Sequence, residues 1–129
     1  MEFLYCFANA SLTHRILDYL LRRVKSQVDC VTVIYLNDCW VIRLKLNAYL
    51  DPKCCDDCWA FLSENGSPYY PSPRVDLAFH ALDTACAPTQ VMNRHHVAIV
   101  SHGTPNPEEV SCFQEQFVAG LGYCPQSLG

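Results

Sequence analysis

The chain has 129 residues, of which 50% are hydrophobic and 17% are charged, and its formal net charge is −4. This composition excludes a disordered chain, and no apolar run approaches the roughly 18 residues that a membrane-spanning helix needs. The negative charge argues against general nucleic-acid binding, which requires cations to neutralise phosphates. We therefore expect one α+β domain over residues 1–129.

The first residues do not have the pattern of a secretory signal peptide. Glu2 occupies the region where a signal needs basic residues, and the apolar run stops at Asn9. We therefore expect a cytoplasmic or nuclear protein whose nine cysteines are thiols or metal ligands. Four of them lie in apolar patterns and are expected to pack as small hydrophobic side chains: Cys6, Cys30, Cys39 and Cys112.

A strand and a long helix are predicted at the start of the chain. Residues 2–8 form a nearly continuous apolar run, which is typical of a buried strand. From Leu12 to Val28, apolar residues then recur every three or four positions, which predicts an amphipathic helix. Ser11 is the expected N-cap of this helix.

The next two segments predict a β-hairpin. Residues 31–36 and 39–46 are rich in β-branched and aromatic side chains and are separated by Asn37-Asp38, which tolerate positive φ angles. A two-residue turn pairs Tyr35 with Trp40, Val33 with Ile42 and Val31 with Leu44, so these apolar side chains share one face. Arg43 and Lys45 then lie on the other face.

The second half of the chain is predicted to contain two more helices and one strand. The cysteine- and proline-rich segment 51–73 is expected to be irregular. A helical pattern follows over 74–87, which begins at the Ser72-Pro73 cap and is stopped by Pro88. Residues 96–100 form a short apolar strand.

Asn106-Pro107 is a typical helix start, with an apolar stripe after it and Gly120 or Gly122 at its end. The stripe consists of Val110, Phe113, Phe117, Val118 and Leu121. The expected order of elements is thus β-α-β-β, an irregular cysteine-rich loop, and α-β-α. It gives a small mixed or antiparallel sheet packed by helices.

The segment 53–61 contains three thiols in five residues beside two aspartates. Cys55 and Cys58 have the spacing of a zinc half-site, in which two thiolates chelate one tetrahedral ion. His80 and Cys86 are the nearest candidates for the second pair of ligands. The sequence therefore predicts a structural zinc site, for which His95 or His96 can substitute as the imidazole ligand.

The same segment also allows a catalytic interpretation. The run from Cys55 to Phe61, Cys-x-x-Cys-Trp-Ala-Phe, resembles the nucleophile segment of papain-like cysteine proteases. This resemblance implies that Cys58 is the nucleophile and His96 its base. Small viral leader proteases of this type release their own C-terminus after glycine, and the chain ends at Gly129. A third interpretation is a packed turn whose half-buried cysteines have no chemical role.

Charge is distributed unevenly along the sequence. Residues 1–53 contain seven basic and five acidic side chains (+2), and the remainder contains two basic and eight acidic ones (−6). Four cations lie on the predicted outer face of the first helix or just after it: Arg15, Arg22, Arg23 and Lys25. They favour docking to an acidic protein partner or to the acidic half of a second copy.

We therefore expect a protein-interaction module with a structural zinc site, with no membrane or nucleic-acid partner. In size and cysteine content it resembles viral and regulatory accessory proteins in general style. The alternative is the papain-like cysteine protease with Cys58 and His96.

Overall fold

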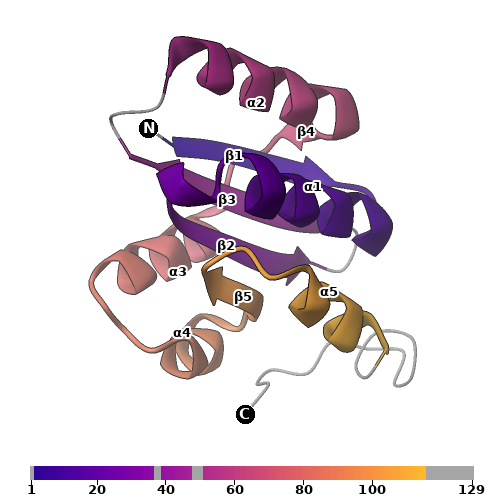
Figure 1. Cartoon of the computed structure of the whole chain (residues 1–129). Coiled ribbons are helices and arrows are strands. Elements are labelled where there is room, and N and C mark those ends of the chain that lie inside the picture. The colour runs from indigo at the N-terminus through magenta and orange to yellow at the C-terminus, as the bar shows by residue number, and fades with distance from the viewer. Residues whose placement is uncertain (1, 37–38, 48–50, 116–129) are drawn as a thin grey trace.

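The structure, a computed structural model, describes residues 2–36, 39–47 and 51–115. Its centre is a five-stranded sheet with the order β4-β1-β3-β2-β5, in which every neighbouring pair is antiparallel (Figure 1). The strands are β1 (Glu2–Phe7), β2 (Val28–Leu36), β3 (Cys39–Leu46), β4 (Ser67–Pro68) and β5 (Ala98–Gly103). The predicted α+β class is confirmed, and the sheet is antiparallel rather than mixed.

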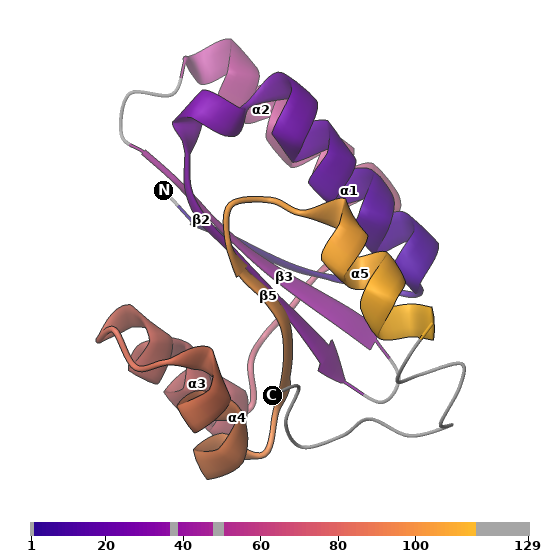
Figure 2. The same ribbon diagram turned by 60° about the horizontal axis from the view of Figure 1, so that its bottom comes forward.

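Helices cover both faces of this sheet. One face carries α1 (Ala10–Arg23), α2 (Pro52–Asn65) and α5 (Pro107–Phe113), and the other carries α3 (Pro73–Asp83) and α4 (Pro88–His95) (Figure 2). A 3-10 turn over Lys25–Gln27 joins α1 to β2. No helix in the described part of the chain is both long and apolar enough to cross a membrane.

Each face of the sheet has its own hydrophobic core. The core under α1, α2 and α5 includes the strand residues Val31, Val33, Ile42 and Leu44. The core under α3 and α4 includes Ile34, Val41 and Ile99 from the strands. Alternate residues of the same strands therefore face the two cores, as the period of two in a strand requires.

The predicted hairpin is confirmed together with its register. Tyr35 pairs with Trp40, Val33 with Ile42 and Val31 with Leu44. The aromatic rings of Tyr35 and Trp40 also contact each other, with centroids 5.0 Å apart. The turn residues 37 and 38 lie outside the described residues.

The first helix begins two residues earlier than predicted. Asn9, and not Ser11, is its N-cap, because the Asn9 side chain accepts a hydrogen bond of 2.9 Å from the Leu12 amide. The helix ends at Arg23 with Val24 as C-cap, so Val28 belongs to β2 and not to the helical stripe. Ile16, Leu17 and Leu20 bury the predicted apolar stripe.

The prediction of an irregular segment over 51–73 is wrong for most of its length. Pro52 opens α2, a helix of 14 residues. Cys58 and Leu62 are its buried residues, and Cys55 packs against the same core. The three-residue spacing of Cys55 and Cys58 is therefore the spacing of one helix face, which is also the spacing of a zinc half-site.

Gly66 lets the chain return from α2 to the sheet. A Cβ atom at this position would lie 2.5 Å from the Cys6 carbonyl oxygen and 2.5 Å from Cε1 of Phe7. Only glycine therefore permits this approach to β1 without a shift. β4 follows at once and pairs with β1, which attaches the end of α2 to the sheet edge.

The segment 74–100 differs from the prediction in two places. Ser72 caps α3 as expected, with its Oγ 3.4 Å from the Val75 amide, but the helix ends at Asp83. Pro88 starts the unpredicted helix α4 instead of stopping the preceding one. His96 is the C-cap of α4 in the left-handed conformation (φ 57°), and the strand begins later, at Ala98.

The last described helix begins as predicted. Asn106 caps α5 by accepting a hydrogen bond from the Glu108 amide, and its Nδ2 donates to Glu109 at 3.2 Å. Val110 and Phe113 are buried. The remaining stripe residues Phe117, Val118 and Leu121, and the glycines expected to end the helix, lie outside the described residues.

Candidate functional site

The structure places the four predicted zinc ligands in two separate layers. Cys55 and Cys58 are on α2, in the core shared with α1. His80 is on α3, and Cys86 packs against the core on the opposite face of the sheet. In the ranges that the structure describes, no three His, Cys, Asp or Glu side chains are arranged to hold a metal ion. The four residues are therefore not brought together.

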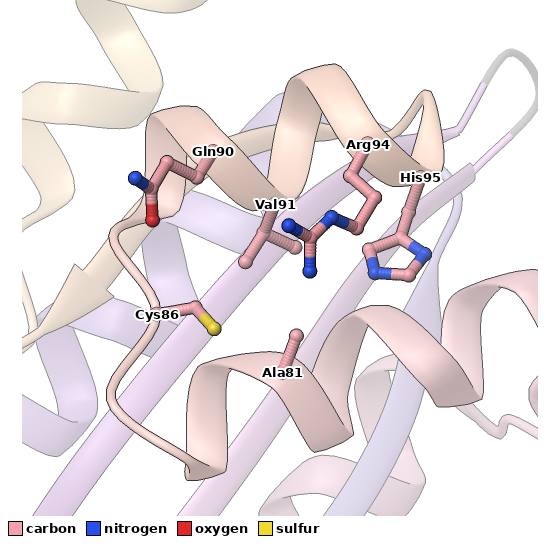
Figure 3. A pocket seen from close by; sticks show the side chains of 6 residues that line it. All are labelled: Ala81, Cys86, Gln90, Val91, Arg94 and His95. Atoms are coloured by element: carbon pink, nitrogen blue, oxygen red, sulfur yellow. The ribbon is translucent and has the colours of Figure 1, made fainter.

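Cys86 instead shares a small pocket between α3 and α4 with His95. Figure 3 shows Cys86 at one end of this pocket and His95 at the other, with Arg94 between them. The cavity is about 10 Å³, which is room for about one water molecule. His95, one of the two substitute ligands, thus lines the same pocket as Cys86, but the pocket is too small for a substrate.

The proposed protease pair is also separated. Cys58 is fully buried in the middle of α2, whereas a papain-type nucleophile is placed at a helix N-terminus. Burial, together with the nearby Cys55, raises the pKa of the Cys58 thiol to about 11. His96 caps α4 on the other side of the sheet and is exposed. Cys58 is therefore a protonated core thiol, without His96 as a base.

The predicted basic residues are all exposed on or next to α1. Arg22 forms a salt bridge of 3.1 Å with Asp18, one turn earlier on the same helix. Within the described residues, Arg15, Arg23 and Lys25 have no carboxylate at ion-pair distance. The outer face of α1 therefore keeps positive charge that its own helix does not neutralise.

A shallow groove of about 190 Å³ runs between α1 and α2. Its lining includes Arg23 from α1 and Asp57 from α2. Next to it, the rings of Tyr19 and Phe61 stack with centroids 4.2 Å apart and hold the two helices together. Partial burial raises the pKa of the Tyr19 hydroxyl, so it stays protonated and polar at neutral pH.

A polar cluster lies on the other face of the sheet, between the central strands and the end of α3. It consists of Cys30, Thr32, Arg43, Lys45, Asp83 and His102. The strand register explains it, because Cys30 is opposite Lys45, and Thr32 lies between Arg43 and His102. Directly opposite residues have Cβ atoms about 5 Å apart, close enough for their side chains to interact.

Asp83 holds the two cations of this cluster. Arg43 donates to both of its carboxylate oxygens at 2.8 and 3.1 Å, and Lys45 donates at 2.7 Å. Burial by itself raises the pKa of Asp83, but the hydrogen bonds from Lys45 and Arg43 outweigh it and hold the pKa below its ordinary value. The carboxylate is therefore ionised at neutral pH.

Arg43 is the most buried charged side chain of the cluster, with only 4% of its surface exposed. Its guanidinium lies 4.4 Å from the centre of the Phe79 ring, in a cation–π contact. Its Nε makes no hydrogen bond and lies 3.7 Å from a Glu2 carboxylate oxygen. The prediction that Arg43 lies on the face opposite the hairpin's apolar face is correct. The face that carries Arg43 is also covered, by α3.

His102 joins the cluster to the edge strand β5. Its Nδ1 lies 2.8 Å from the Thr32 hydroxyl, and its Nδ1 and Nε2 lie 3.7 and 3.9 Å from the Cys30 sulfur. Partial burial lowers the pKa of His102, and the charges of Arg43 and Lys45 lower it further, against the opposing effect of Asp83. The imidazole is therefore neutral at pH 7.

Sequence reasoning missed this cluster. Cys30 was expected to be a core thiol, yet it is half-buried beside His102, and Cys112, expected to be packed in the same way, is exposed. Because alternate residues of a strand share a face, the sequence places Cys30 and Thr32 on one face of β2, and Arg43 and Lys45 on one face of β3. This alternation is the signal from which part of the cluster could be predicted. Asp83 and His102 come from distant segments, and nothing local in the sequence indicates their contact with the hairpin.

Comparisons with known proteins bear on the fold alone. No protein-family model matches the sequence, and no curated protein matches it. Among solved structures, the C-terminal domain of YpbH is similar, with a TM-score of 0.51 and 15% sequence identity. The match covers 90% of this chain and 98% of that one. This likeness places the chain in the same class of small α+β folds.

Proposed function

We propose that the chain is a protein-interaction module that binds an acidic protein surface through the outer face of α1. The observation that carries the proposal is the set of exposed cations there, of which only Arg22 has an ion-pair partner among the described residues. In a chain of net charge −4, such a face is the region that attracts an acidic partner.

Two further features support this interpretation. The helix next to α1, α2, exposes 55% of Trp59, and exposed aromatic side chains are common anchors of protein interfaces. The residues predicted for a zinc site and for a protease lie on opposite sides of the sheet. Zinc binding or protease chemistry would require these separated residues to meet, whereas binding through α1 uses side chains that are already on one surface.

A charge reversal on α1 tests the proposal. We expect Arg22→Glu combined with Arg23→Glu to abolish association with partners captured by the wild-type protein, because both changes oppose an acidic surface. The melting temperature should change little, because exposed charges contribute only about 0–1 kcal/mol to stability. The measurements are affinity capture at two salt concentrations, together with thermal unfolding.

The matched control reverses two exposed arginines on the opposite layer. Arg74→Glu combined with Arg94→Glu changes the net charge by the same amount but should leave association intact. Sedimentation of the purified protein tests whether the acidic partner is a second copy. Capture that survives the α1 reversal, or that is lost equally in the control, would contradict the proposal.

A further inference from the structure

Cys30 lies beside a base, His102, and neither residue belongs to the predicted zinc site or to the predicted protease pair. Its sulfur lies 3.7 Å from Nδ1 and 3.9 Å from Nε2 of His102, and both distances are within the range of a sulfur hydrogen bond. The two residues come from β2 and β5, in which His102 pairs with Thr32, two residues after Cys30. Cys30 is half-buried and His102 is exposed, so the pair is accessible to a small reagent.

Thr32 orients the imidazole of His102. Thr32 is buried, with 1% of its surface exposed, and its hydroxyl lies 2.8 Å from Nδ1 of His102. When Nδ1–H donates to this hydroxyl, the lone pair of the neutral ring is on Nε2. Nδ1, at 3.7 Å from the Cys30 sulfur, is then occupied by Thr32, and Nε2, at 3.9 Å, is the nitrogen able to accept the thiol proton.

Three elements packed around Cys30 and His102 contribute charged side chains: β3, α3 and β1. β3 contributes Lys45, directly opposite Cys30, and the buried Arg43. Asp83 from α3 binds both cations, and Glu2 from β1 lies opposite Lys45. An adjacent general base activates a thiol by accepting its proton, because the thiolate is the reactive form.

We propose that Cys30 and His102 form a reactive thiol–imidazole pair that exchanges with low-molecular-weight disulfides of the glutathione disulfide type. This site is on the face opposite α1 and does not depend on the proposed interaction function. Cys30 is thus a redox modification site of the protein.

The exchange is balanced in atoms and electrons. Nε2 of His102 accepts the proton of Cys30, and the thiolate attacks one sulfur of glutathione disulfide. A new S–S bond joins Cys30 to one glutathione, while the disulfide bond of the reagent breaks. The second glutathione leaves as a thiolate and takes the proton from the imidazolium. Cys30 is oxidised and the released glutathione is reduced.

The test measures the rate of mixed-disulfide formation at each cysteine by peptide mass mapping after exposure to glutathione disulfide at pH 7. We expect Cys30 to react about tenfold faster than the exposed Cys112. His102→Gln should slow the reaction of Cys30 about tenfold, because the base is lost, and leave Cys112 unchanged. Equal rates at the two cysteines, or an unchanged rate at Cys30 in His102→Gln, would overturn the proposal.

Two further variants separate chemistry from folding. Cys30→Ser keeps the size of the side chain and should remove the fast-reacting site, and a fast site that persists would refute the assignment. Thr32→Val removes the hydroxyl that orients His102 and should slow Cys30, whereas Thr32→Ser should restore the rate. If Thr32→Val and Thr32→Ser react alike, Thr32 does not position the imidazole.

Discussion

The two faces of the central sheet are formed by the same strands and are buried in different ways. Toward α1, α2 and α5, β3 presents Trp40, Ile42, Leu44 and Leu46, all of them buried and apolar. Toward α3 and α4, the same strand presents Cys39 and Val41 and then the charged Arg43 and Lys45. One face is a uniform apolar core, and the other changes from apolar to polar along the strand.

This difference shows that one face of a small sheet can supply most of the stability while the other face holds a polar cluster. An apolar face contributes free energy of folding in proportion to the surface it removes from water. A polar cluster covered by a helix needs partners for each charge, and here Asp83 supplies them for Arg43 and Lys45. The polar half of the second face is therefore where side chains of different chemical kinds come together.

The largest expected effect is a cavity in the uniformly apolar face. Leu20→Ala on α1 should lower the free energy of unfolding by about 4 kcal/mol, because Leu20 is fully buried. Leu82→Ala, in the core on the other face and close to the C-terminal end of α3, should cost only about 2 kcal/mol. Urea unfolding of both variants measures the contrast. Equal losses would mean that the two cores are equally well packed.

A smaller effect is expected when the polar face loses its carboxylate. Asp83→Asn leaves the buried Arg43 without its anionic partner and should cost about 2 kcal/mol, a value reduced because Asp83 itself is partly exposed. Lys45→Met removes only the more exposed cation and should cost less than about 1 kcal/mol. If Lys45→Met destabilises as much as Asp83→Asn, burial of Arg43 is not what makes the carboxylate important.

An effect confined to alkaline solution is expected as a pH dependence of the apolar face. Burial and the nearby Cys55 raise the pKa of Cys58 from 9.0 to about 11, so the folded state retains a proton that the unfolded chain releases. Stability is therefore unaffected below pH 9 and falls as the pH rises toward 11, by on the order of 2 kcal/mol.

Cys58→Ala isolates this contribution from other groups that titrate in alkali. The variant is expected to be less stable at pH 7, because it leaves a cavity, but its stability should fall less steeply between pH 9 and 11. Unfolding by urea across this pH range measures the slope. Identical slopes for the variant and the wild type would show that the Cys58 thiol ionises in the folded protein.

The hairpin is the clearest case of structure that the sequence determines. Its register depends on a turn of two residues and on alternation over neighbouring positions, and both are local. The structure confirms the pairing of Tyr35 with Trp40 for this reason. The start of α5 at Asn106 is similarly local, because a cap depends on residues within one turn.

The helix α2 shows why the spacing of the cysteines does not by itself define their role. A spacing of three residues places Cys55 and Cys58 on one helix face and also suits two ligands of one zinc ion. Local spacing does not distinguish these alternatives. The distinction depends on whether a second ligand pair lies nearby, and Cys86 lies on the other side of the sheet.

The sequence by itself determined the α+β class, the first helix, the hairpin with its register and the exposed basic residues of α1. Each of these follows from periodicity or turn chemistry within a few residues. Only the tertiary structure decided that Arg43 is covered by α3 and that Cys30 lies beside His102, 72 residues away. Such contacts depend on strand order and on which face a helix covers, and these are properties of the whole packed chain.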